Sequence, residues 1–128
     1  MTAIERHGSG GPWEKTYGYS RVVRAGHNVH VSGCTGVDGD GNVVSDSAYE
    51  QAVQALVNIE AALQMAGASI SDVVRTRIYI TDIALSDEVG RAHGEVFEAA
   101  RPAMAIVGVA ALVSPQMLVE IEADAYLA

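Results

Sequence analysis

RPAMAIVGVAALVSPQMLVEIEADA, residues 101–125, is the stretch that decides the fold of this 128-residue chain. Its first half, residues 103–112, is an almost unbroken run of small and β-branched apolar residues, a pattern typical of a strand buried on both faces. Ser114 and Pro115 follow and predict a turn, because proline cannot donate a hydrogen bond to a strand ladder. A second strand then begins at Met117, so we expect a hairpin at the centre of the fold.

The second strand, residues 117–126, alternates strictly in polarity. Successive side chains of a strand point to opposite faces, and neighbours on one face stand about 7 Å apart. One face carries Val119, Ile121, Ala123 and Ala125, and the other carries Glu120, Glu122 and Asp124 with Leu118 and Tyr126. We expect the apolar face to enter the core and the acidic face to look onto a polar site.

Length and composition indicate one folded domain. Of the 128 residues 49% are hydrophobic and 19% are charged, which suits a chain that buries a core. Sixteen acidic and eight basic residues give a formal net charge of −8, which disfavours binding to nucleic-acid phosphates. The single cysteine, Cys34, excludes an intrachain disulfide and fits a reducing compartment. No run approaches the roughly 18–20 apolar residues of a membrane helix, so we expect a cytoplasmic protein with no membrane partner.

The N-terminal residues and the strands follow from local patterns. Residues 1–16 are rich in glycine and polar groups, and we interpret them as a flexible lead-in to a single domain, residues 17–128. Alternating apolar residues predict strands over residues 17–24, 27–34 and 73–81.

Two amphipathic helices complete the chain. The first spans residues 47–66, with Ser47 and Glu50 at the spacing of a capping box and Gly67 directly after its end. The second begins near Ser86, which resembles an N-cap. The order β-β-α-β-α-β-β predicts a two-layer α+β domain in which two helices cover one face of a sheet. The other face must then be polar or buried in an oligomer, with ligand pockets at the seams between subunits.

Several stretches occur in a recognisable order: Gly18-Tyr19, Val31-Ser32-Gly33, the DGDGN turn at residues 38–42, the helix ending at Ala66-Gly67, Asp72-Val73-Val74, and RPA with LVEIEA between residues 101 and 123. Together they resemble the RidA/YjgF family over residues 17–126. The resemblance implies a chorismate-mutase-like fold and a homotrimer with three clefts between subunits. It also implies hydrolysis of reactive enamines and imines to 2-keto acids and ammonia without a cofactor. An older label for some members is endoribonuclease or translation inhibitor.

One position departs from the family pattern. In the deaminating members, an arginine directly after the Pro-Ala of this signature grips the substrate carboxylate, whereas this chain has Met104. A thioether cannot form the bidentate, charge-assisted pair that a guanidinium forms with a carboxylate. Arg101 lies close in sequence but out of register with that position. We therefore expect a more apolar cleft, with Met104 and Ile106 among the substrate-binding residues and a neutral or bulkier ligand.

The resemblance assigns roles to three further residues. Glu120 matches the family's pocket glutamate, which helps to position the attacking water and so acts in catalysis. Tyr19 matches a cleft tyrosine whose hydroxyl orients a ligand, and Gly33 matches a glycine whose backbone approaches the ligand closely. The alternatives are that the acidic face pairs with Arg75, Arg77 or a neighbouring chain, that Tyr19 is a packed aromatic and that Gly33 is a plain bulge.

Arg21 and Cys34 are the remaining substrate-binding candidates. Arg21 shares the face of Tyr19 by the period of a strand, and it would replace the missing anion anchor unless it is simply an exposed arginine. Cys34 would be a nucleophile if His30 or His27 favoured its thiolate, and otherwise it is an inert buried thiol.

No known cofactor motif is present. The four histidines show no metal-ligand spacing, and the sequence has neither a P-loop nor GxGxxG, so we expect no metal and no cofactor. The leading hypothesis is a homotrimer that hydrolyses or deaminates a small metabolite in the cleft between subunits. The alternative is a non-catalytic small-molecule-binding module on the same fold. The net charge of −8 and the lack of a basic stripe disfavour the ribonuclease label.

Overall fold

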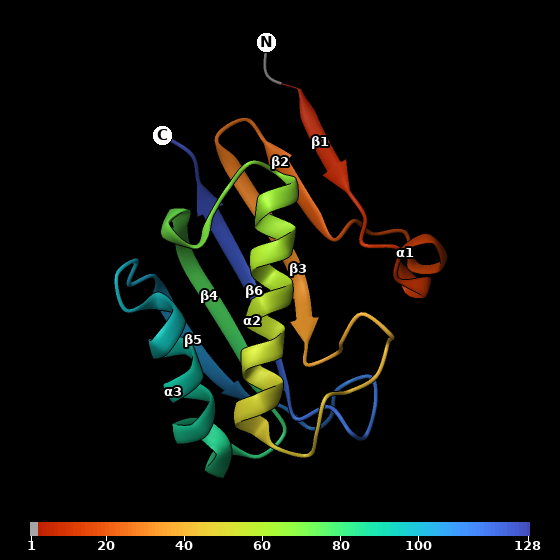
Figure 1. Cartoon of the computed structure of the whole chain (residues 1–128), viewed down its shortest axis with the longest axis vertical. Helices are drawn as coiled ribbons and strands as arrows, with labels where there is room; N and C mark the ends of the chain where they lie inside the picture. The colour runs from red at the N-terminus through yellow and green to blue at the C-terminus, as the bar shows by residue number, and fades with distance from the viewer. Residues whose placement is uncertain (1–2) are drawn as a thin grey trace.

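Within residues 3–128, which this computed structural model describes, six strands form one mixed sheet in the order β1-β2-β3-β6-β4-β5 (Figure 1). The strands are β1 (Ile4–His7), β2 (Val22–Ala25), β3 (Asn28–Thr35), β4 (Val73–Ile80), β5 (Ala103–Gly108) and β6 (Val119–Tyr126). Two long helices, α2 (Ala48–Met65) and α3 (Ser86–Phe97), lie side by side across one face, and a short helix, α1 (Pro12–Tyr17), stands at the β1 end of the sheet. The two-layer α+β prediction is confirmed. None of the helices in this part of the chain has the length and apolar character needed to cross a membrane.

Strand β6 lies at the centre of the sheet, antiparallel to both β3 and β4. Its predicted alternation is confirmed, because Val119, Ile121, Ala123 and Ala125 are buried against the helices while the three carboxylates are only partly buried. The core between sheet and helices also contains Ile78 and Ile80 of β4 and Leu56, Ile59 and Leu63 of α2.

The predicted hairpin between the last two strands is wrong. β4 lies between them and pairs with β6 on one side and, in parallel, with β5 on the other. A parallel pair needs a crossover connection, and α3 supplies it between β4 and β5. Sequential strands often pair, but here the crossover places the two strands of residues 101–126 on either side of β4.

The prediction that residues 103–112 form a strand buried on both faces is also wrong for the single chain. β5 ends at Gly108 and is the edge strand of the sheet. Of its residues only Ile106 is even partly buried, while Met104 and Val107 are each 45% exposed. An apolar, exposed edge strand is the surface that a folded chain covers with another chain.

Helix α2 forms as predicted. The Ser47 hydroxyl accepts a hydrogen bond from the Glu50 amide at 3.2 Å, and Gly67 adopts a φ of 79° directly after the cap residue Ala66. The second helix starts differently, because Ser86 is its first residue rather than its N-cap. Asp82 caps the preceding 3-10 turn instead, accepting a hydrogen bond from the Ala84 amide at 3.0 Å.

The N-terminal segment has more structure than we expected. Residues 4–7 form β1, which pairs with β2, and α1 starts at Pro12. The strand predicted over residues 17–24 begins only at Val22, because α1 extends to Tyr17 and residues 18–21 turn the chain back to the sheet. Residues 1–2 of the predicted lead-in lie outside the described residues.

Candidate functional site

A bulge in β3 brings the Glu120 side chain against the chain backbone. The pairing of β3 with β6 shifts register between Val31 and Cys34, and Gly33 lies within this shift. A Cβ atom on Gly33 would stand 2.5 Å from Glu120 Oε2, which is closer than any real contact. A side chain at residue 33 would therefore displace the Glu120 carboxylate, and the register shift shows that Gly33 lies at a bulge.

Arg21 forms the other side of this cluster. Its Nη1 donates to the Gly33 carbonyl at 2.8 Å and contacts Cys34 Sγ at 3.5 Å, and its Nη2 donates to the Tyr19 hydroxyl at 3.4 Å. The Arg21 side chain is only 16% exposed, and its Nε lies 3.8 Å from Glu14 Oε2. Arg21 is therefore not a free surface arginine, and most of its donors are already engaged within the chain.

The Glu120 carboxylate has no such partners. Across residues 3–128 no side chain forms an ion pair or hydrogen bond with it. Burial raises the pKa of Glu120, repulsion from Glu122 raises it further, and the charge of Arg21 lowers it only in part, so the net shift is upward. A partly buried carboxylate with a raised pKa is suited to exchange protons with water near neutral pH.

The other two carboxylates of β6 are paired. Arg77 Nη1 lies 3.1 Å from Glu122 Oε1 and 3.2 Å from Asp124 Oδ2. The Tyr79 hydroxyl donates to Glu122 at 3.1 Å, and His30 Nδ1 lies 2.8 Å from Asp124 Oδ1. This network is the cross-strand pairing that we considered for the whole acidic face, and Glu120 is outside it.

Cys34 points into the core, on the Ile121 side of the sheet, and is 4% exposed. Burial raises the pKa of the Cys34 thiol, Glu120 raises it as well, and the nearby Arg21 charge offsets only part of this. Neither histidine reaches it, because His30 bonds Asp124 and His27 Nδ1 contacts the Leu127 carbonyl at 2.7 Å. The geometry therefore offers no base that would make Cys34 a nucleophile.

Met104 and Ile106 lie apart from this cluster. Met104 is in register with Thr76 and Ile106 with Ile78, both of which face the helices, whereas Glu120 is in register with Tyr79 on the opposite face. β5 is also two strands from β6, a separation of about 10 Å. Within one chain the structure thus groups Tyr19, Arg21, Gly33, Cys34 and Glu120 and leaves Met104 and Ile106 out.

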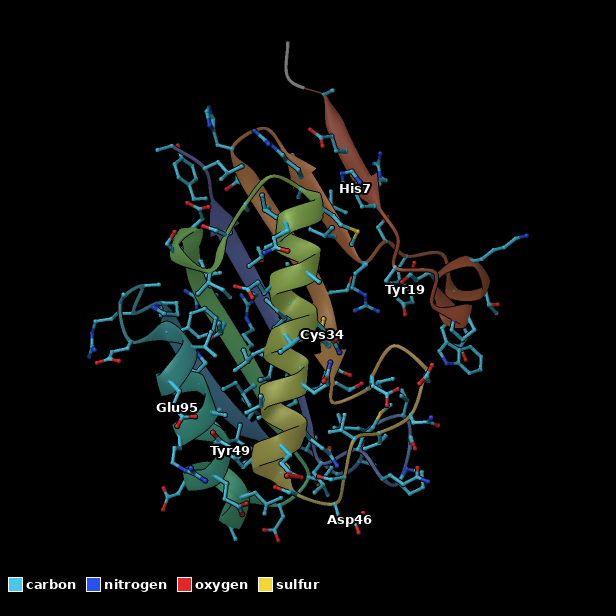
Figure 2. All side chains as sticks on the ribbon, viewed as in Figure 1. His7, Tyr19, Cys34, Asp46, Tyr49 and Glu95 are labelled. Carbon is cyan, nitrogen blue, oxygen red and sulfur yellow. The ribbon has the colours of Figure 1, made fainter. Side chains whose placement is uncertain are left out.

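Tyr19 lies where the cluster meets the surface, next to α1, whereas Cys34 lies on β3 beside the middle of α2 (Figure 2). A hollow of about 530 Å³ opens on the Tyr19 side. Its lining comprises Arg6, Glu14, Lys15, Gly18, Tyr19, Ser20, Val23 and Ser32. The part of the chain described here holds no group of three or more His, Cys, Asp or Glu side chains placed to bind a metal.

The sequence interpretation missed Glu14. Its carboxylate lies beside Arg21, although the two residues belong to α1 and to the turn before β2. The available signal was a glycine-rich run followed by Pro12, which is a common first residue of a helix. That signal predicts a short helix but not the contact that its glutamate makes.

Comparisons with known proteins match most of the chain. The family model described as Endoribonuclease L-PSP matches residues 13–127. A crystal structure from Mycobacterium tuberculosis, of a member of the YjgF/YER057c/UK114 family, has a TM-score of 0.89 and 46% identity and covers 98% of this chain and 100% of that one. An uncharacterised protein of Streptomyces coelicolor is 36% identical over 124 residues, 97% of this chain and 92% of the relative. The human 2-iminobutanoate/2-iminopropanoate deaminase is 35% identical over 108 residues, 84% of this chain and 78% of the relative.

Proposed function

Because this chain belongs to the RidA/YjgF family, whose model carries the description Endoribonuclease L-PSP, we propose that it is a cofactor-free hydrolase that deaminates a small imine or enamine. The observation that carries the proposal is the Glu120 carboxylate, which has a raised pKa, lacks an ion-pair partner in the described residues and faces the Gly33 backbone. The human relative bears the name of an imine deaminase.

In the proposed reaction Glu120 accepts a proton from water as the water oxygen bonds to the imine carbon. The carbon–nitrogen π electrons move to nitrogen, which takes up that proton. The added hydroxyl then gives its proton to Glu120, which passes it to the nitrogen, and the carbon–nitrogen bond breaks as the carbonyl forms, so that ammonia leaves. The attack needs ionised Glu120, so activity rises with pH through the pKa of Glu120, which lies above its ordinary value.

We propose that a complete site requires a second copy of the chain, in the homotrimer that the family resemblance implies. Met104 and Ile106 face away from Glu120 within one chain, so β5 of another copy would have to bring them to it. The exposed apolar side chains of β5, Met104 and Val107, support an interface there. Sedimentation of the purified protein as a monomer at micromolar concentration would contradict this proposal.

The substrate that fits best lacks a carboxylate beside its imine. Met104 offers no charge, and the Arg21 donors are engaged by Gly33, Tyr19 and Glu14. The same observation favours one other function, a binding module that holds a neutral metabolite without reacting. The net charge of −8 does not favour the endoribonuclease activity named in the family description.

The test compares two imines generated in situ, 2-iminopropanoate from an amino-acid oxidase and an uncharged alkyl imine from an amine oxidase. We expect wild type to accelerate ammonia release from the uncharged imine more than from 2-iminopropanoate. Glu120→Gln should reduce the rate of the accelerated reaction by about 100-fold or more. Met104→Arg should shift the preference toward 2-iminopropanoate. If wild type and Met104→Arg leave both imines unaffected, the binding module replaces the deaminase.

A further inference from the structure

The glycine-rich segment before α1 encloses a single carboxylate, that of Glu14. The Ser9 amide donates to both Glu14 oxygens, at 3.1 and 3.3 Å, and the Ser9 hydroxyl donates to Oε2 at 2.5 Å. The Glu14 side chain is only 11% exposed as a result. Although burial acts to raise the pKa of Glu14, the Ser9 bonds and the Arg21 charge outweigh it, so Glu14 stays ionised well below neutral pH.

Two glycines lie directly against this carboxylate. A Cβ on Gly8 would stand 2.7 Å from Glu14 Oε1, and one on Gly11 would stand 3.3 Å from Oε2. Gly10 between them turns the chain with a φ of 80°, a backbone angle that residues with a side chain rarely adopt. Residues 8–11 thus pack around the Glu14 carboxylate, whereas a flexible lead-in would make no such contact.

The enclosed carboxylate faces the candidate site through Arg21. Glu14 Oε2 stands 3.8 Å from Arg21 Nε, while the other edge of the guanidinium contacts the Tyr19 hydroxyl and the Gly33 carbonyl. Gly33 in turn lies against Glu120. Removing Glu14 would therefore free one edge of Arg21 and remove one of the two carboxylates, Glu14 and Glu120, whose charges offset the guanidinium.

The charges of these groups decide which substrates the site can attract. Glu14 and Glu120 carry two negative charges against the one positive charge of Arg21, while Glu122 near Glu120 is paired with Arg77. We propose that Glu14 is a positioning and specificity-determining residue, which holds Arg21 against Tyr19 and Gly33 and cancels its charge so that the site prefers uncharged substrates to carboxylates. This inference rests on the proposed function, which identifies the site, and adds the residue that sets the charge of the preferred substrate.

The first test measures binding of two probes of nearly equal shape, pyruvate and uncharged pyruvamide, by isothermal titration calorimetry on the assembled protein. Wild type should bind pyruvamide more tightly. Glu14→Gln should shift the ratio of the two affinities toward pyruvate by about three- to fivefold, because one charge near the site is removed. Glu14→Asp keeps the charge and should retain the wild-type ratio. Glu98→Gln, which removes an exposed charge just beyond α3, is the matched control and should also leave the ratio unchanged.

The second test follows the titration of Glu120 by carbon-13 NMR of its side-chain carboxyl. The charged and titratable groups around Glu120 are Arg21, Cys34 on β3, Tyr79 on β4 and Glu122 on β6. Glu14→Gln should lower the measured pKa of Glu120, since one negative charge that offsets Arg21 is removed. Ser9→Ala, which loosens Glu14 but keeps its charge, should lower it less.

The two tests separate the two proposals. If no variant binds either probe while Glu14→Gln shifts the Glu120 titration, the proposed function fails and the coupling through Arg21 stands. If the Glu120 titration and the affinity ratio are the same in wild type and Glu14→Gln, Glu14 only holds the N-terminal segment in place and the inference is overturned.

Discussion

At the scale of single residues, Glu120 is held in an environment that opposes its charge. Burial and Glu122 raise its pKa, so the folded state retains the Glu120 proton to a higher pH than the unfolded chain does. The ionised carboxylate therefore destabilises the fold above that pKa, and the destabilisation disappears as the pH falls through it. Residues kept for function commonly oppose stability in this way.

Glu120→Gln should consequently raise stability while it abolishes the proposed activity. At pH 7 we expect the free energy of unfolding to rise by roughly 0.5–1 kcal/mol, measured by urea denaturation. The gain should shrink at pH 4, where wild-type Glu120 is largely protonated. Asp124→Asn is the matched control, because Asp124 is paired with Arg77 and His30 and its loss should destabilise the protein. A less stable Glu120→Gln protein would contradict this account of the site.

At the scale of elements, one buried amide joins α2 to the start of β6. The Gln51 side chain has no exposed area, its Nε2 donates to the Ser45 and Gln116 carbonyls at 2.8 and 2.9 Å, and its Oε1 accepts from the Leu118 amide at 2.9 Å. Gly36 leaves the space for it, since a Cβ there would stand 2.6 Å from Gln51 Cα. Gln51 therefore fixes the backbone that leads directly into Glu120.

Gln51→Leu should destabilise the protein by roughly 3 kcal/mol or more, because two carbonyls and one amide lose their buried partner. Thermal denaturation checks the loss of stability. The imine assay should show reduced turnover as well, since Leu118 lies two residues before Glu120. Gln64→Leu, an exposed position on the same helix, is the comparison and should change stability by less than about 0.5 kcal/mol. Equal effects at both positions would mean that Gln51 does not fix this connection.

At the scale of the whole molecule, the layer between sheet and helices contains one buried titratable side chain that opposes folding in acid. His93 on α3 is 7% exposed, its Nε2 lies 2.8 Å from Thr76 Oγ1 of β4, and its ring packs at a tilt against Phe97. Burial lowers the pKa of His93 below its ordinary value of 6.5. The unfolded chain therefore protonates His93 at a higher pH than the folded chain does. Above about pH 6.5 His93 is neutral in both states and does not oppose folding, and below that pH its protonation in the unfolded chain lowers the free energy of unfolding.

Between pH 7 and pH 5, urea denaturation should thus show a less favourable change in stability for wild type than for His93→Asn, because the loss at His93 is added to the gain that protonation of Glu120 brings. His7→Asn is the control, because His7 lies on the edge strand β1 with 34% of its side chain exposed, outside the layer between sheet and helices, and its replacement should not flatten the dependence. A wild-type dependence that persists unchanged in His93→Asn would assign the acid sensitivity to another group.

The exposed edge of the sheet belongs to this scale as well. The sequence predicts a fully buried strand over residues 103–112, yet the single chain leaves Met104 and Val107 of this segment each 45% exposed. The two findings agree if the missing burial comes from another copy, because a strand buried between chains has the same composition as one buried within a chain.

The sequence alone determined the features that depend on short-range periodicity. The alternation of residues 117–126 specifies which face of the strand meets the core, and the cap of α2 specifies where that helix begins; both are confirmed. The motifs between Gly18 and Ala123 identified the family.

The tertiary structure alone decided what depends on long-range pairing. Periodicity assigns faces but not strand order, so the sequence could not show that β4 separates β5 from β6 or that Met104 faces away from Glu120. The contact of Glu14 with Arg21 was equally invisible, because it joins α1 to a turn that folds back beside it. Local residue patterns record how each element is buried, whereas the order and contacts of the elements arise only when the whole chain packs.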